Sequence, residues 1–269
     1  MGAPQLAALG VLNQGGGVHR VILSRFNESP DGYARRVPTP VIPTRPDPLR
    51  VCFVSMHTSP VSPPGAGDAG GMNVVELAQA LALARCGHQV ELVTRRHSPD
   101  DPGHRELAPG VTLHHLDAGP ATPLPKSAID EYIDQFSTGL AGLGPFDIYH
   151  SHHWMSGIAA LPVARAAGAR HVQSFHSVAA PSGSSLEAGE PAESPRRVPG
   201  EVLVATASDA VVAISAAEAR TVIERCGADP ARVHIISPGV VHDLFRPRLA
   251  GEAGWIPAGG VGRNGFIAF

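Results

Sequence analysis

From Val51 onward, the chain alternates short apolar runs with longer segments in which apolar residues recur every three or four positions. Short apolar runs between turn residues are typical of buried strands, and the longer period indicates helices with one apolar face. The expected strands are Val51–Met56, Gln89–Thr94, Val111–Leu116, Asp147–Ser151, His171–Phe175, Ala210–Ile214 and Val233–Ile236. The expected helices are Met72–Cys86, Ser127–Leu143, Ser156–Ala167, Pro199–Ala207 and Ala216–Cys226. Strands that alternate with crossover helices predict an α/β fold built on a doubly wound parallel sheet.

The last of these helices has the clearest boundary signals. Ser215 precedes it in the position of an N-terminal cap, and Glu218 completes the pattern of a capping box. Gly227 follows the last apolar position, where helices commonly end in a left-handed residue. We therefore expect the helix to begin at Ala216 and to end at Cys226.

Three regions depart from the alternation. Prolines recur through Val37–Pro48, so we expect residues 1–49 to form a poorly ordered, extended lead. Residues 179–197 are rich in Ser, Gly, Pro and Glu and should form a long loop, which is usually functional or disordered. Residues 249–269 are expected to be a linker and the first strand, Phe266–Phe269, of a missing C-terminal domain, because a lone strand cannot bury itself. The folded domain should then span residues 50–248.

Composition narrows the function classes. The chain has 269 residues, is 43% hydrophobic and carries a net charge of −3, with no basic run, which argues against a nucleic-acid surface. Its three cysteines, Cys52, Cys86 and Cys226, form no C-x-x-C pair, so we expect buried thiols in a reducing compartment. No apolar run is long enough for a transmembrane segment, and no signal peptide is recognisable. The expected localisation is therefore cytoplasmic.

A glycine loop lies between the first expected strand and the first expected helix. His57 follows the strand, and a Pro/Gly segment then leads to Gly70, Gly71, Met72 and Asn73 at the start of the helix. Strand, glycine loop and helix aim backbone N–H groups and a positive helix end at an anion such as a diphosphate. Neither G-x-G-x-x-G nor a P-loop is present, so a tight strand-to-helix turn without a ligand remains an alternative.

Histidines mark the end of a second strand. His150 and His152 face the same way because side chains alternate along a strand, and His153 follows them. With His57 and His176 at comparable strand ends, they could bind a metal ion and support a metal-dependent hydrolase. Histidines that are hydrogen-bonded within the sheet are the alternative explanation, and it stays open here.

Cations lie near the same expected edge of the sheet. Lys126 follows a Gly-Pro turn, and Arg196 and Arg197 end the long loop before a helix. Each could be a solvated surface residue, but together they could pair with a phosphate. The sequence shows no G-x-S-x-G nucleophile motif and no pair of carboxylates suited to general acid–base catalysis.

Five motifs in the same order resemble the family-4 retaining glycosyltransferases, in particular the branch that serves mycothiol biosynthesis in actinobacteria. They are SMHTSP, PPGAGDAGGMNV, HSHHWMSG, FHS, and a final pair, SAAEA with SPGV-DLFRP, and they cover about residues 50–269. The resemblance implies a GT-B fold of two Rossmann-like domains, of which this chain holds the acceptor-side N-terminal one.

The resemblance also implies an activity. A sugar, N-acetylglucosamine, would pass with retention from a UDP-sugar donor to a phosphorylated polyol such as inositol phosphate, without a protein nucleophile, a metal or a cofactor in this domain. Electrostatic stabilisation of the leaving diphosphate would supply the catalysis. The expected partners are the nucleotide sugar, the phosphorylated small-molecule acceptor and, as an option, a second copy of the chain. The chain alone would be inactive, and a non-catalytic remnant that binds a phosphorylated polyol is a further alternative.

The resemblance also implies roles for individual residues, at the positions where this sequence matches the family motifs. The acceptor would be bordered by His57, Asp68, Gly70, Gly71, Met72 and Asn73, and its phosphate would be contacted by Lys126, His153, Ser177 and Arg196. The donor would be contacted by Pro63, Pro64 and Gly71, and His176 would contact the donor sugar as the catalytic residue. Two positions depart from the family, because His153 replaces Tyr and Ser177 replaces Thr. We expect the imidazole of His153 to add positive charge below about pH 6.5.

Overall fold

The computed structural model of the protein describes residues 47–65, 67–185 and 189–239. The expected lead at residues 1–46 and the expected linker and strand at residues 249–269 lie outside the described residues and stay predictions. Among the described residues, no helix combines the length and the apolar character that crossing a bilayer requires. Cys52 and Cys226 are buried free thiols, whereas Cys86 is exposed, so the expectation of burial is wrong for Cys86.

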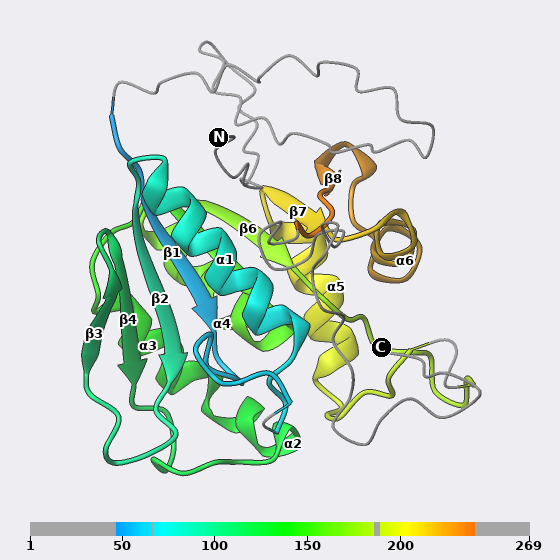
Figure 1. The fold of residues 1–269 in the computed structure, drawn as a ribbon. Coiled ribbons are helices and arrows are strands. Elements are labelled where there is room, and N and C mark those ends of the chain that lie inside the picture. Colours follow the sequence, from blue (N-terminus) through cyan, green and yellow to red (C-terminus); the bar gives the residue numbers. More distant parts are fainter. Residues whose placement is uncertain (1–46, 66, 186–188, 240–269) are drawn as a thin grey trace, which may run out of the picture. The chain divides into compact units, whose positions relative to one another are not determined.

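The eight strands form one sheet (Figure 1). They are β1 (Arg50–Ser55), β2 (Gln89–Arg95), β3 (His104–Ala108), β4 (Val111–Leu116), β5 (Ile148–His152), β6 (Arg170–Ser174), β7 (Ala210–Ala213) and β8 (Val233–Ile235). Their order across the sheet is β3-β4-β2-β1-β5-β6-β7-β8, and every neighbouring pair is parallel except β3 and β4. The predicted α/β fold with a parallel sheet is therefore confirmed.

Strand β3 is the exception to the sequence prediction. It pairs antiparallel with β4 across a two-residue connection that contains Gly110, whose φ of +78° lies in the left-handed region. Its residues, HRELA, are largely exposed, so they lack the apolar run that identified the other strands. An antiparallel edge strand on an otherwise parallel sheet is common in large α/β folds.

The helices follow the predicted order with one break. They are α1 (Gly71–Arg85), α2 (Lys126–Ile129), α3 (Ile133–Ala141), α4 (Trp154–Ala166), α5 (Arg197–Ala207) and α6 (Ala216–Cys226), with 3₁₀ turns η1 (Asp130–Tyr132) and η3 (Pro230–Arg232). The single helix expected over Ser127–Leu143 is thus wrong, because η1 separates α2 from α3. The prediction for α6 is confirmed at both ends: Ser215 Oγ accepts the Glu218 N–H at 3.1 Å, and Gly227 has a φ of +70°.

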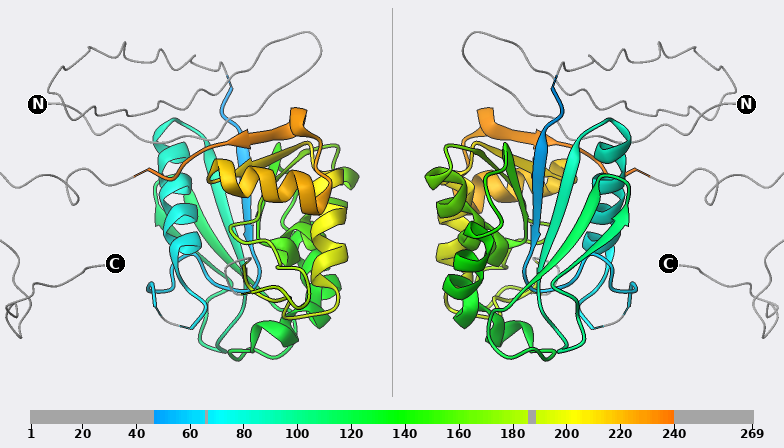
Figure 2. Two further views of the ribbon diagram at one scale, coloured as in Figure 1. Left: turned by 90° about the vertical axis from the view of Figure 1, so that its right-hand side faces the viewer. Right: turned by 90° about the vertical axis from the view of Figure 1, so that its left-hand side faces the viewer.

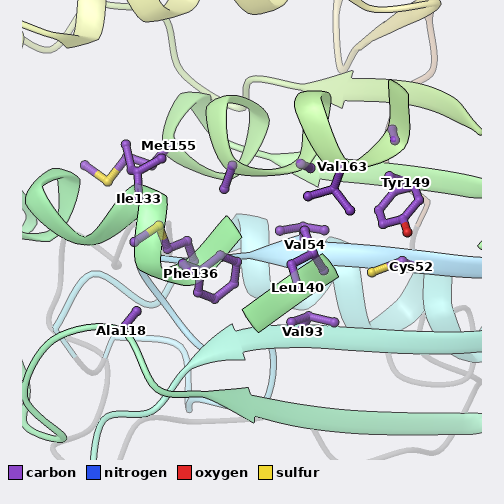
Figure 3. Close-up of a cluster of buried hydrophobic side chains, with 14 of the residues drawn as sticks. Cys52, Val54, Val93, Ala118, Ile133, Phe136, Leu140, Tyr149, Met155 and Val163 are labelled. Atoms are coloured by element: carbon purple, nitrogen blue, oxygen red, sulfur yellow. The ribbon is translucent and has the colours of Figure 1, made fainter. Parts of the chain in front are cut away.

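Helices cover both faces of the sheet (Figures 1 and 2). On one face, Phe53 and Leu92 pack against Ala80 and Leu83 of α1. On the other face, the buried residues of α3 and α4 pack against β1 and β2 in the cluster drawn in Figure 3. Further along this second face, Val204 of α5 and Val222 of α6 cover β7. The sheet is therefore doubly wound, as predicted.

The topology defines one switch point. The chain leaves β1 toward β2 and β4, and then returns to form β5 on the opposite side of β1. In open α/β sheets, ligands bind outside the carboxyl ends of the strands at such a point. His57 follows β1, and His153 directly follows β5, so this rule indicates a binding site at these two histidines.

Candidate functional site

His57 and His153 form a buried pair at the switch point. Their ring centroids lie 4.3 Å apart, and the two residues are only 8% and 2% exposed. His153 is held by its backbone N–H, which donates to the Ser174 carbonyl at 2.9 Å, and its φ of 70° is rare outside glycine. Among the described residues, His57 Nδ1 and both ring nitrogens of His153 have no hydrogen-bond partner. Buried polar atoms without a partner are the exception in proteins, so these atoms point to a ligand.

Both imidazoles of this pair are neutral at pH 7. Burial, with the positive charge of Lys126 as the next cause, lowers the pKa of His57 to about 3. Burial also lowers the pKa of His153 well below its ordinary value, with the neighbouring His57 and Lys126 as smaller causes. The expectation that His153 adds charge near pH 6.5 is therefore wrong. Each ring can instead donate one hydrogen bond and accept another, as a polyol hydroxyl requires.

A second group of histidines consists of His150 and His152, in β5, and His176, which follows β6. His150 Nε2 lies 2.9 Å from Ser174 Oγ, and His152 Nδ1 lies 2.8 Å from His176 Nε2. Burial lowers the pKa of all three, to about 4 for His176. The described part of the chain contains no group of three or more His, Cys, Asp or Glu that could hold a metal ion. The geometry thus favours hydrogen bonding within the sheet for one nitrogen of each ring, whereas His150 Nδ1 and His152 Nε2 have no partner among the described residues.

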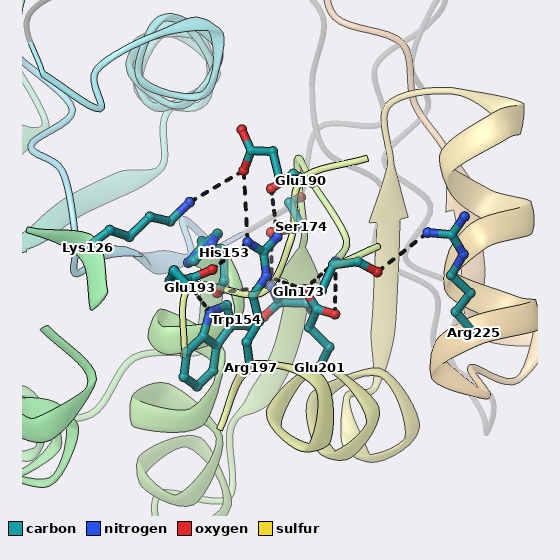
Figure 4. Close-up of polar contacts among 12 residues, drawn as sticks. Lys126, His153, Trp154, Gln173, Ser174, Glu190, Glu193, Arg197, Glu201 and Arg225 are labelled. Atoms are coloured by element: carbon teal, nitrogen blue, oxygen red, sulfur yellow. Dashed lines mark hydrogen bonds and ion pairs between the residues drawn. The ribbon is translucent and has the colours of Figure 1, made fainter. Parts of the chain in front are cut away.

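Two cations converge beside the histidine pair. Lys126 begins α2, and Arg197 begins α5. Lys126 Nζ lies 3.9 Å from Glu190 Oε2, and Arg197 Nη1 lies 3.9 Å from the same oxygen (Figure 4). Arg197 also donates to Ser177 Oγ at 3.1 Å. The structure therefore brings Lys126 and Ser177 together, as the sequence indicated, around a position that an anionic oxygen occupies.

Arg197, and not the neighbouring Arg196, contacts Ser177, and the predicted contact of Arg196 with the acceptor phosphate stays a prediction. The Arg196 side chain is exposed, and its Nη1 donates to the Asp130 carbonyl at 2.8 Å, away from Ser177. Arg197 is buried between Glu193 at 2.6 Å and Glu201 at 2.8 Å. Sequence reasoning gave Arg197 no family role, although the spacing of four residues from each of these glutamates was a signal that it faces them.

The carboxylates around Arg197 fix its position. Burial would lower the pKa of the guanidinium, but hydrogen bonds to Glu201 and Glu193 outweigh this effect and raise it. Glu193 also accepts the Trp154 Nε1–H at 2.8 Å, and Glu201 accepts the Ala179 N–H. Three of the five guanidinium N–H groups are used in these contacts and in the one to Ser177, which leaves two for a ligand.

The start of α1 lies at the same edge of the sheet. Asn73 uses its whole amide within the chain: Oδ1 accepts the Gly70 N–H, and Nδ2 donates to Thr58 Oγ1 and the Ser59 carbonyl. Asn73 thereby ties α1 to the loop that follows His57, and its predicted acceptor contact stays a prediction. A Cβ added to Gly71 would meet no heavy atom of the protein within 4 Å, so this glycine is not required by packing.

The remaining predicted positions lie on the loop between β1 and α1. Asp68, Pro63 and Pro64 are exposed, and Met72 is half-buried in the first turn of α1. Pro63 and Pro64 border an apolar groove against Val74 and the rest of α1. Their predicted contacts with donor and acceptor stay predictions.

Comparisons with known proteins agree with this geometry. Residues 70–239 match the family of the glycosyl transferase 4-like domain. The chain is 40% identical over 201 residues to D-inositol 3-phosphate glycosyltransferase 1 of Catenulispora acidiphila, covering 74% of this chain and 48% of the relative. It is 39% identical over 212 residues to D-inositol 3-phosphate glycosyltransferase of Thermobifida fusca, covering 77% and 49%. The chain thus spans about half the length of these curated relatives.

A solved structure shows the same fold. Sucrose-phosphate synthase from Thermosynechococcus elongatus superposes with a TM-score of 0.67 at 23% identity, over 74% of this chain and 50% of that one. At this identity the likeness concerns the fold alone.

Proposed function

Because the chain belongs to the glycosyl transferase 4-like family, we propose that it forms the acceptor-binding part of a retaining glycosyltransferase. The sugar, N-acetylglucosamine, is transferred from a UDP-sugar to a phosphorylated polyol, D-inositol 3-phosphate. The acceptor is the one named in the curated relatives. The donor sugar and a place in mycothiol biosynthesis follow from the family motifs. The chain spans about half the length of these relatives, and we assign acceptor binding to the part that it matches.

One observation carries the proposed acceptor. Lys126 and Arg197 approach a single anionic oxygen from two different helices, each at 3.9 Å. Two cations at one oxygen, with the Ser177 hydroxyl beside them, suit the clustered oxygens of a phosphate. Lys126 is the only lysine in the sequence, so this side chain has no near substitute for the role.

Other residues near the two cations bind the polyol ring and the sugar donor. His57 and His153, neutral and with unpartnered nitrogens, bind hydroxyl groups of the polyol ring. The backbone N–H groups of the first turn of α1 face the donor diphosphate and stabilise the charge that develops on it as the glycosidic bond breaks. His176, oriented by the hydrogen bond to His152, contacts the donor sugar. The acceptor hydroxyl attacks from the face that the diphosphate leaves, which gives retention without a protein nucleophile.

Lys126→Ala should weaken binding of D-inositol 3-phosphate by roughly 1.5–3 kcal/mol, the range for a hydrogen bond to a charged group. Inositol, which lacks the phosphate, should bind the variant and the wild type alike. Isothermal titration of the purified chain with both ligands measures the difference. Arg85→Ala, which removes an exposed cation at the far end of α1, is the matched control and should leave both affinities unchanged.

Equal losses for inositol and its phosphate would show that Lys126 supports the fold and not the phosphate. Arg196→Ala separates the two neighbouring arginines. Its exposed side chain contacts the Asp130 carbonyl and not the proposed site, so this variant should bind both ligands like the wild type.

A further inference from the structure

Glu190 differs from the two other carboxylates near Arg197. Glu193 and Glu201 hold the guanidinium at 2.6 and 2.8 Å, and their side chains are 14% and 2% exposed. The Glu190 side chain is 67% exposed and lies 3.9 Å from both Arg197 and Lys126. Glu193 and Glu201 are therefore lasting partners of Arg197, whereas the Glu190 carboxylate is held loosely and bridges the two cations (Figure 4).

The backbone of Glu190 is fixed even though its side chain is exposed. The Glu190 carbonyl accepts the Ala180 N–H at 2.8 Å, three residues after Ser177. The preceding Gly189 has a φ of +117°, and a Cβ at this position would come within 3.3 Å of the Val178 carbonyl oxygen. Glycine is thus required for this close approach. Rotation of the Glu190 side chain alone would free the two cations without breaking the backbone contact.

We infer that Glu190 is a built-in competitor of the acceptor phosphate, whose carboxylate holds the position between Lys126 and Arg197 and yields only to a more highly charged group. The inference rests on the proposed function, because it takes this position to be that of the acceptor phosphate. A phosphate monoester carries a charge of about −1.5 to −2 at pH 7 and three acceptor oxygens. A carboxylate carries at most one negative charge, and a polyol hydroxyl carries none. A neutral polyol therefore does not displace Glu190, and a phosphorylated one does.

The charge balance of the group supports this role. Lys126 and Arg197 contribute two positive charges, and the three glutamates contribute three negative charges, so the group sums to 2 − 3 = −1 with Glu190 in place. An incoming phosphate is repelled while the Glu190 carboxylate remains between the cations. Neutralising Glu190 changes the sum to zero and leaves Lys126 with no carboxylate within ion-pair distance among the described residues.

Glu190→Gln, which keeps the shape and removes the charge, tests the inference. The variant should bind D-inositol 3-phosphate about 2- to 30-fold more tightly than the wild type, the range for the loss of two partly exposed ion pairs. Its affinity for unphosphorylated inositol should not change. Isothermal titration of the whole chain at low ionic strength, where screening is weak, gives both values. Glu106→Gln, on the exposed edge strand β3, removes the same charge outside the group of Lys126, Arg197 and their glutamates and should bind like the wild type.

A second readout does not depend on a ligand. Because Lys126 is the only lysine, protein labelled with ¹³C-lysine gives one set of lysine signals. Glu190→Gln should shift the Lys126 Cε signal, and Glu106→Gln should not. An unshifted signal, or equal or weaker phosphate binding by Glu190→Gln while the wild type binds, would overturn the inference and leave the proposed acceptor site standing. Failure of both wild type and Glu190→Gln to bind D-inositol 3-phosphate would refute the proposed function and the inference with it.

Discussion

Gly71→Val should reduce sugar transfer by about 100-fold or more while the fold stays intact, because the valine side chain would hold the diphosphate away from the backbone N–H groups, and the loss of one preorganised donor has an effect of that size. Gly71 is the first residue of α1, and we place the donor diphosphate against its backbone. A Cβ there would meet no protein atom within 4 Å, so the valine side chain would project into the space that we assign to the ligand. Any defect should therefore come from the ligand and not from packing.

Sugar transfer is the quantity to be measured. Transfer from UDP-N-acetylglucosamine to D-inositol 3-phosphate can be followed in a chimera that continues, after residue 239, with the second half of the Catenulispora acidiphila relative. Gly103→Val is the control, since a Cβ at Gly103 also meets no atom within 4 Å and its backbone needs no positive φ. The two variants should melt at similar temperatures. Normal turnover by Gly71→Val would show that no ligand approaches this glycine.

Acidification from pH 6.5 to pH 5 should lower the stability of the domain by several kcal/mol. Burial lowers the pKa of His57 to about 3 and those of His171 and His176 to about 4. Below about pH 6.5 the unfolded chain takes up protons that the folded one cannot, so stability falls with pH through this window. Each such group costs about 1.4 kcal/mol per pH unit, and three cost about 4 kcal/mol per unit. The free energy of unfolding of a native domain is only about 5–15 kcal/mol in total.

Three carboxyls whose pKa burial raises, Glu76, Glu201 and Glu218, act in the opposite direction. Burial raises the pKa of Glu76 to about 8, so the folded chain holds a proton that the unfolded chain releases above about pH 4.5. This group makes stability fall as pH rises toward 8, and Glu76→Gln should lessen that fall. Stability should therefore be greatest near pH 6.5 in the wild type. Between pH 6.5 and 5 the histidines outweigh these carboxyls, because burial lowers the pKa of six of them: His57, His150, His152, His153, His171 and His176.

Urea unfolding at pH 8, 6.5, 5.5 and 5 measures the whole profile. His171→Gln removes one titrating group, whose ring bridges Ser151 and Ser208. The free energy of unfolding of this variant should fall less steeply between pH 6.5 and 5 than that of the wild type. His104→Gln, on the exposed edge strand β3, should have the wild-type profile. A free energy of unfolding that stays constant between pH 6.5 and 5 would contradict the buried, neutral state of the histidines.

The sequence predicted the fold where burial leaves a strong pattern. The central strands are apolar runs because both of their faces are covered, and α6 has its cap and its terminal glycine. Strand β3 was missed because it lies at an edge and is mostly exposed. The break between α2 and α3 was missed because Asp130–Tyr132 continues the same apolar spacing through a 3₁₀ turn. The helix propensity of a segment does not distinguish an α-helix from a short 3₁₀ turn.

The candidate site was predicted in part for the same kind of reason. Strand ends are visible in the sequence, so His57 and His153 could be placed at the carboxyl ends of two strands, but only the strand order brings their rings to 4.3 Å. Arg196 and Arg197 are neighbours on one helix start, and the choice between them depends on about 100° of rotation that the sequence does not specify. Glu190 belongs to a loop without periodicity, and only the tertiary structure brings it to Lys126.

A crystal structure of the chain soaked with D-inositol 3-phosphate tests the central claim most directly. The account predicts the phosphate between Lys126 and Arg197, with its oxygens about 2.7–2.9 Å from their nitrogens, and the Glu190 carboxylate turned out to solvent. The inositol hydroxyls should face His57 and His153. A phosphate bound elsewhere, or bound while the Glu190 carboxylate still bridges Lys126 and Arg197, would contradict the account.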